Sequence, residues 1–228
     1  SGGIPKLIDT GPDNLNITLE TIKKKVTKKT KCIVIVHVGA IISDEIVKIA
    51  KFCKSKKIFL VEDCAHASLT KLGNKYAGNF GIAGAFSFYS TKSITSGEGG
   101  MVTTNNKDLA DLMNQIRNHG ATVSEEQRHN GPKPYILPDF NLLGYNYRMT
   151  DLQGAVGIVQ LGKLDTFIEE RAKWANWYRE HLAGIECQCQ PRLLPLACHH
   201  LVRKCCGKSC EKRRICLEPR FRTSITMF

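Results

Sequence analysis

Hydrophobic and polar positions alternate along most of the chain in a way that predicts strands and helices in turn. Two runs rich in β-branched residues, 31–38 and 58–64, have the length of strands and are apolar enough to be covered on both faces. Between them, apolar residues recur at helical spacing over 46–53, with Ser43 as the expected N-cap and the acidic pair after it in the first turn. A strand, a helix and a strand at this spacing form a βαβ unit, so we expect parallel strands.

The alternation continues beyond residue 80. The pattern predicts five further elements, two strands around a glycine-rich turn and three helices: 83–89, 100–104, 107–118, 151–161 and 165–182. Residues 121–141 contain prolines and show no clear period, which predicts a long loop. Strands that alternate with helices place the chain in the α/β class, with a mostly parallel sheet flanked by helices.

Composition separates the last fifth of the chain from the rest. Residues 186–228 hold nine Lys and Arg against three Glu, which is half of the net charge of +12, and seven of the ten cysteines. We therefore divide the chain into a partial large domain, 1–184, and a cysteine-rich basic tail of doubtful origin, 185–228, which we expect to be disordered. A shifted reading frame or a foreign join beyond residue 185 is one hypothesis for this change. The tail has no Cys-x-x-Cys pair, and adjacent cysteines fit a tetrahedral site poorly, so no metal is expected.

Several classes of protein are disfavoured by the same composition. The longest apolar stretch, 32–42, is about half the length of a membrane span, and no secretory signal is visible. The scattered cysteines of residues 1–184 are typical of a reduced, cytoplasmic domain. Half of the excess charge is concentrated in the tail, and no groove-reading motif accompanies it, which argues against nucleic acid. The lysine cluster at 23–31 is interpreted as a solvated helix end rather than a patch for an anionic partner.

Two residues near the end of the predicted strand 58–64 could carry chemistry. In open α/β sheets, ligands bind beyond the carboxyl ends of the parallel strands. Asp63 stands at such an end, although from this segment alone a turn or helix-capping role is equally good. His66 follows three residues later and, taken alone, is more simply a partly buried structural histidine.

A lysine at the end of the next strand favours a catalytic interpretation. Lys92 follows the strand 83–89, flanked by hydroxyl residues and by the flexible turn 96–100. Such an amine can hold the aldehyde of pyridoxal phosphate (PLP) as a Schiff base once it has lost its proton. Asp63 is then the candidate acid opposite the pyridine nitrogen, and Ser87 with the N–H groups of the turn could bind the phosphate. The glycines alone would be a weak signal.

Three motifs in this order make the chain similar to a known family. They are 61–67 (VEDCAHA), 86–92 (FSFYSTK) with 96–100 (SGEGG), and 144–151 (GYNYRMTD). Together they resemble the DegT/StrS family of PLP-dependent sugar aminotransferases over about residues 3–184. The resemblance implies the large domain of the fold-type I aminotransferase architecture, incomplete in this chain, and a homodimer with active sites at the subunit interface.

The resemblance also implies a role for each matched residue. Lys92 would form the internal aldimine and later carry the substrate proton, and Asp63 would pair with the pyridinium nitrogen. His66, where many relatives carry Gln, would lie against the ring or its phenolic oxygen. Ser87 would bind the phosphate, and Asn146 would reach the phosphate or substrate of the neighbouring subunit's site. The implied reaction moves an amino group, usually from glutamate, to a keto group on a nucleotide-linked sugar.

Departures from the family keep other interpretations open. Members are typically much longer. We expect a segment before residue 1 to supply phosphate ligands and a residue that stacks on the cofactor, and a small domain after residue 184 to close over the substrate. We therefore expect that the 228-residue chain by itself is not a competent aminotransferase. A PLP-dependent sugar dehydratase on the same fold is one alternative, against which Lys92 argues because that branch typically carries His there. A catalytically inactive fragment or a regulatory binding protein is the other.

Overall fold

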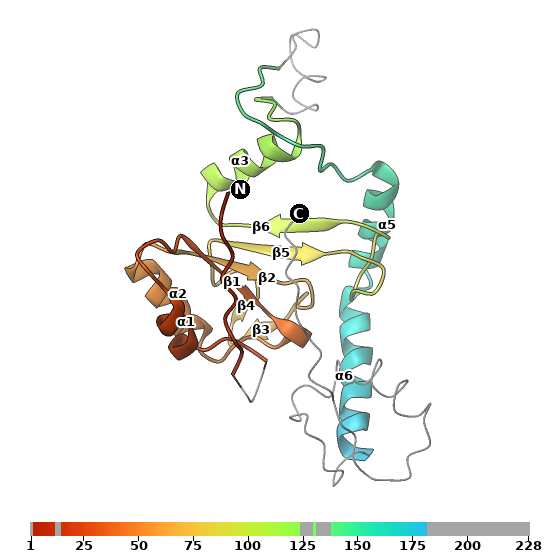
Figure 1. Cartoon of the computed structure of the whole chain (residues 1–228). Helices are drawn as coiled ribbons and strands as arrows, with labels where there is room; N and C mark the ends of the chain where they lie inside the picture. The colour runs from red at the N-terminus through yellow and green to blue at the C-terminus, as the bar shows by residue number, and fades with distance from the viewer. Residues whose placement is uncertain (1, 12–14, 124–129, 131–137, 182–228) are drawn as a thin grey trace, which may run out of the picture. The chain divides into compact units, whose positions relative to one another are not determined.

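The computed structural model describes residues 2–11, 15–123, 130 and 138–181 (Figure 1). The chain divides into two compact units at Phe167, and the first unit contains the sheet and every candidate site residue. The predicted tail, 185–228, lies outside the described residues, as does most of the predicted loop 121–141. The disorder and the lack of metal expected for the tail therefore stay predictions.

A four-stranded sheet forms the centre of the first unit. Its strands, in spatial order, are β1 (Cys32–Val36), β2 (Phe59–Asp63), β5 (Ala83–Ser87) and β6 (Gly100–Thr103). The strands β1, β2 and β5 are parallel, and β6 is antiparallel to β5. All four coincide with predicted strands, so the α/β class and the mostly parallel sheet are confirmed. A small hairpin, β3 (Lys71–Leu72) and β4 (Lys75–Tyr76), is absent from the prediction because two-residue strands are too short to show a period.

Helices with defined bounds in the described part are α1 (Leu19–Lys25), η1 (Val38–Ala40), α2 (Ile46–Ser55), α3 (Lys107–Arg117), α5 (Asp151–Leu161) and α6 (Leu164–His181). The last three lie close to their predicted ranges, and side-chain caps from Asn106 and Thr150 explain where α3 and α5 begin. The helix α1 ends in three exposed lysines, as expected for a solvated helix end. Within the described ranges, no helix combines the length and low charge needed to cross a bilayer.

The helix α2 begins later than the sequence predicts, and Ser43 is not its N-cap. The Ser43 hydroxyl accepts the N–H of Glu45, and Asp44 and Glu45 form a turn before the helix. Glu45 takes the N-cap position without a side-chain capping hydrogen bond, because its carboxylate accepts the N–H of Leu19 at the start of α1 (2.8 Å). A tertiary contact therefore uses the acidic side chain that the prediction placed in the first turn.

The core of the first unit draws on α1, α2, β1 and β2. Its large buried side chains are Ile22, Ile33, Ile35, Ile46, Ile49, Cys53 and Leu60. Each aliphatic side chain of this kind contributes about 1.5–3 kcal/mol when fully buried. This packing fixes β1 beside β2 in register, from Cys32 opposite Phe59 to Val36 opposite Asp63. The residues that follow the two strands therefore emerge at one edge of the sheet.

Candidate active site

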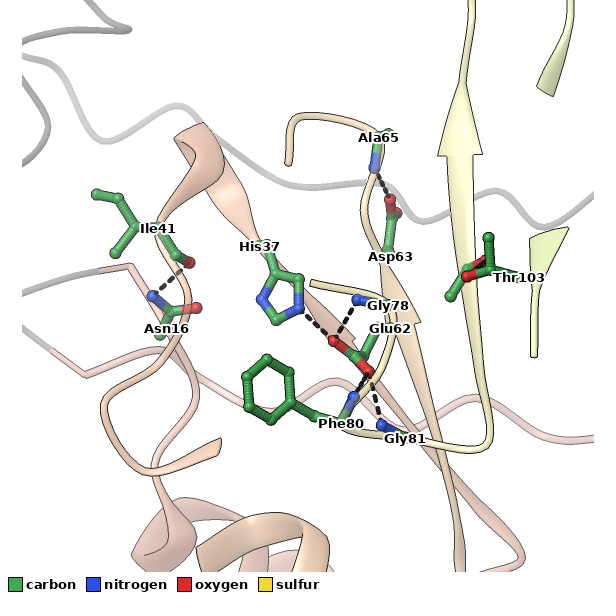
Figure 2. Close-up of polar contacts among 11 residues, drawn as sticks. Asn16, His37, Ile41, Glu62, Asp63, Ala65, Gly78, Phe80, Gly81 and Thr103 are labelled. Carbon is green, nitrogen blue, oxygen red and sulfur yellow. Dashed lines mark hydrogen bonds and ion pairs between the residues drawn. The ribbon is translucent and has the colours of Figure 1, made fainter. Parts of the chain in front are cut away.

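Asp63, the last residue of β2, stands at the carboxyl edge of the sheet. Its carbonyl accepts the N–H of His37, just beyond β1 (3.0 Å), and the N–H of Cys64 donates to Ala85 of β5 (2.7 Å). The carboxylate oxygen Oδ1 accepts the N–H of Ala65 (3.0 Å; Figure 2), which is the turn contact that the sequence left open. The half-buried carboxylate forms no ion pair within the described part of the chain, so it is oriented but not neutralised.

His66 lies near the same edge. Its Nδ1 accepts the N–H of Gly39 in η1 (3.3 Å), where a φ of 64° favours glycine. Partial burial and then the positive charge of Lys92 lower the pKa of His66, and the negative charge of Asp63 opposes the shift. These interactions place both Lys92 and Asp63 within electrostatic reach of His66 and favour a neutral imidazole.

Ser87 and Lys92 lie at the end of the neighbouring strand. Ser87 ends β5, and its hydroxyl accepts the N–H of Tyr89 (3.3 Å). The Lys92 N–H donates to the Tyr89 carbonyl (3.0 Å), and the N–H of Phe88 donates to Gly99 (2.8 Å) where the chain turns back into β6. The Lys92 side chain is half-buried, and it forms no ion pair with the residues that the structure describes. Its amine is therefore available to a ligand.

Asn146 is placed apart from the other four candidates. It is exposed and pairs with Asn118 in an isolated antiparallel bridge. Backbone bonds on either side, from Tyr145 to Ile116 (2.7 Å) and from Tyr147 to Arg117 (2.9 Å), fasten this segment to the end of α3. No contact among the described residues brings Asn146 to Asp63 or Lys92, so its role toward a neighbouring subunit stays a prediction.

A buried carboxylate directly before Asp63 is absent from the predicted site residues. Glu62 and His37 are both fully buried, and a carboxylate oxygen of Glu62 accepts a hydrogen bond from His37 Nε2 at 2.9 Å (Figure 2). The sequence does hold a signal for this pair. A glutamate within an apolar strand needs a partner when it is buried, and a histidine ends the apolar run of the adjacent strand.

Cys64, which follows Asp63, has an unreactive thiol. Burial first, and then the negative charges of Glu62 and Asp63, raise the pKa of its thiol to about 12. A thiol is a poor nucleophile and a poor metal ligand compared with a thiolate. Cys64 therefore serves as a small apolar core residue at this edge.

The donor groups at this edge fit PLP. The cofactor needs a fixed carboxylate for its ring nitrogen, a primary amine for its aldehyde, and hydroxyl and N–H groups for its phosphate. Asp63, Lys92 and Ser87 offer these groups from the ends of the adjacent strands β2 and β5. His66, at the same edge, interacts electrostatically with both the acid and the amine.

Proteins of known sequence and structure match most of the chain. GDP-perosamine synthase of Vibrio cholerae is 35% identical over 187 residues, which are 82% of this chain and 48% of that protein. Helicobacter pylori PseC, an aminotransferase involved in pseudoaminic acid biosynthesis, matches with a TM-score of 0.72 and 29% identity over 80% of this chain and 46% of that one. Escherichia coli GDP-4-keto-6-deoxy-D-mannose-3-dehydratase with bound hydrated PLP has a TM-score of 0.66 and 31% identity, over 78% and 47% of the two chains. The chain spans about half the length of the relatives it matches.

These likenesses settle the fold and the family. The matched structures are PLP-dependent enzymes of fold-type I, so the sheet of β1, β2, β5 and β6 is part of that architecture. The cofactor of the family is PLP, in agreement with the expectation from the sequence. The sequence profile of the family matches residues 1–218, a range that runs beyond the predicted limit at residue 184. The chain belongs to the DegT/DnrJ/EryC1/StrS aminotransferase family.

Proposed function

We propose that the full-length protein is a PLP-dependent aminotransferase that moves an amino group from an amino acid, glutamate, to a nucleotide-linked keto-sugar. The observation that carries this proposal is the shared edge of β2 and β5, where an oriented carboxylate and an available amine interact with the same histidine. The names of the relatives support the substrate class, because one is a GDP-perosamine synthase and another is an aminotransferase involved in pseudoaminic acid biosynthesis.

Each candidate residue has a task that follows from its place. Bound PLP supplies an aldehyde that captures amines and a ring that withdraws electrons from the bonds next to the captured nitrogen. Asp63, held by the Ala65 N–H, would keep the ring nitrogen protonated through its negative charge. The Lys92 amine would hold the aldehyde, and once released from it Nζ would accept the proton that the substrate carbon loses.

The remaining candidate residues would contact the phosphate and the ring face of PLP. Ser87 would donate its hydroxyl to the phosphate together with N–H groups of the turn that follows β5. His66, whose neutral form is favoured by its surroundings, would lie against the ring without adding a second positive charge there. We also propose that the protein is a cytoplasmic homodimer in which Asn146 reaches the partner's site; the exposed bridge that holds Asn146 supports this assignment.

A sugar dehydratase is the second candidate, because a dehydratase is among the similar solved structures. The two reactions start from the same cofactor and the same class of sugar. Lys92 favours transamination, since an aliphatic amine can both hold the aldehyde and shuttle the proton.

The test is to supply the full-length protein with PLP, glutamate and a panel of nucleotide-linked keto-sugars. We expect release of 2-oxoglutarate together with a sugar in which the keto oxygen is replaced by an amino group, identified by mass spectrometry. Lys92→Arg should abolish both products, and Lys54→Arg at an exposed position of α2 should not. A sugar that loses water would instead establish the dehydratase, and bound PLP without turnover of any substrate would establish an inactive binding protein.

A further inference from the structure

The side chain of Glu62 lies on the core side of β2, where it gathers four hydrogen bonds (Figure 2). Its Oε2 accepts from His37 Nε2 (2.9 Å) and from the N–H of Gly78 (2.8 Å). Its Oε1 accepts the N–H groups of Phe80 and Gly81, both at 2.6 Å. A carboxylate offers about four lone-pair positions, so all of them are used. We refer to Glu62, His37 and the three N–H groups as the Glu62 clamp.

The carboxylate of this clamp stays ionised at neutral pH. Burial by itself raises the pKa of Glu62, but the hydrogen bonds from His37, Gly81 and Gly78 outweigh burial and hold the pKa below its ordinary value. Hydrogen bonds to a charged acceptor are roughly twice as strong as neutral ones. The clamp is therefore a strong local restraint on every group that donates to it.

A metal ion is a poor alternative occupant of this place. His37, Glu62 and Cys64 do offer ligand atoms within 4.8 Å of one another. Every lone pair of Glu62 is already taken by a donor, however, and the Cys64 thiol keeps its proton because its pKa is about 12. The three side chains are thus better explained by the clamp.

The clamp acts directly on the strand end that carries Asp63. Glu62 and Asp63 are consecutive in β2, so their side chains point to opposite faces of the sheet. His37 is shared between them, because its side chain binds Glu62 while its backbone N–H donates to the Asp63 carbonyl (3.0 Å). Loss of the Glu62 contact would loosen His37, whose N–H is one of the donors that orient the Asp63 main chain.

The clamp also reaches the strand that carries Ser87 and Lys92. The three N–H groups belong to residues 78–81, which lead into β5. This segment packs tightly on β5: a Cβ built at Gly84 would lie only 2.3 Å from the Cα of Gly78. One carboxylate therefore joins the ends of β1 and β2 to the start of β5.

We propose that Glu62 and His37 are positioning residues, which set the orientation of Asp63 toward the ring nitrogen of PLP through the clamp. The proposal rests on the proposed function, because it assigns Asp63 that partner. It differs from a purely stabilising role in its consequence. A stabilising pair changes only the fraction of folded protein, whereas a positioning pair changes the state of the cofactor within the folded protein.

The experiment uses the full-length holoenzyme reconstituted with PLP labelled with ¹⁵N in its ring, whose chemical shift reports whether the ring nitrogen is protonated. Glu62→Gln and His37→Leu break the clamp, whereas His37→Gln keeps an N–H donor near the position of Nε2. Glu20→Gln removes an exposed carboxylate and serves as the matched control. All spectra are recorded at a temperature where circular dichroism shows each variant to be folded.

Glu62→Gln and His37→Leu should move the ¹⁵N signal toward the unprotonated position, while His37→Gln and Glu20→Gln keep the signal of the unaltered protein. Turnover of the two clamp variants should fall by about 100-fold with KM less affected, the scale of a misplacement of about 1 Å. If Glu62→Gln does not fold, the comparison of His37→Leu with His37→Gln decides. Unchanged ¹⁵N signals in folded clamp variants would overturn this inference alone. An unaltered protein that shows no bound PLP signal would overturn the proposed function and this inference with it.

Discussion

Replacing the buried carboxylate Glu62 by its neutral amide should lower the free energy of unfolding by about 2–5 kcal/mol. Glutamine keeps one acceptor oxygen, so of the four N–H donors that reach Glu62, two would face an NH₂ group. Each buried donor left without a partner costs about 1–3 kcal/mol. In its other tautomer, the His37 ring could accept from the new amide, which leaves one donor without a partner and places the expected loss toward the lower end of the range.

The same substitution should change how stability depends on pH. The pKa of Glu62 in the folded protein lies below its ordinary value of 4.5. The stability that its ionisation contributes is therefore fully present above the unfolded-state pKa and is lost as pH falls through the lower folded-state pKa. Glutamine does not titrate, so the difference between the two proteins should stay constant near neutrality and shrink at pH values below about 4.5.

Urea unfolding at several pH values measures both quantities, provided that the slope with denaturant is the same for the two proteins. Glu20→Gln controls for the loss of a carboxylate at an exposed position. A difference below about 0.5 kcal/mol at pH 7, the range of ordinary surface substitutions, would refute the reasoning. A difference that does not shrink in acid would refute the assignment of the charge to Glu62.

Three further predictions concern the surroundings of this site. His66 should be neutral at pH 7 in the protein without cofactor. Lys92→Met should raise the pKa of His66 in an NMR titration, because the positive charge that lowers it is removed. An unchanged pKa would show that Lys92 does not act on His66. Gly84→Ala should lower the free energy of unfolding by about 1–3 kcal/mol through overpacking against Gly78. Gly154→Ala in α5, where a new Cβ meets nothing within 4 Å, should cause no loss. Equal effects of the two substitutions would argue against tight packing of Gly84 on Gly78. Cys64 should resist alkylation by iodoacetamide at pH 8 in the native protein and react after unfolding, and rapid native labelling of the Cys64 peptide would contradict a thiol pKa of about 12.

The elements of the sheet could be predicted because their signals are local. β1, β2, β5 and β6 are runs of apolar residues bounded by polar turns, and the helix between β1 and β2 forces a parallel connection. The start of α2 could not be predicted, since it depends on a contact between Glu45 and Leu19, which are 26 residues apart. Local propensity favoured Ser43 as the N-cap, and a long-range bond overrode that preference.

The candidate site also contains one part that the sequence predicts and one part that it does not. Asp63, Ser87 and Lys92 stand at strand ends, and strand ends are visible in the sequence. The Glu62 clamp depends on N–H groups of residues 78–81 that carry no side-chain signal at all. Its donors lie 16 to 25 residues from Glu62 in the sequence, and the packing of β2 between β1 and β5 brings them together.

The central claim is that Lys92 is the amine that holds PLP while Asp63 faces the ring nitrogen. Reducing the full-length holoenzyme with borohydride and mapping its peptides tests this claim most directly, because reduction fixes the pyridoxyl group on the lysine that carries it. The account predicts a single labelled peptide, residues around Lys92, and the same label in an Asp63→Asn variant that has lost most of its turnover. A pyridoxyl group on another lysine, or on none, would contradict the account.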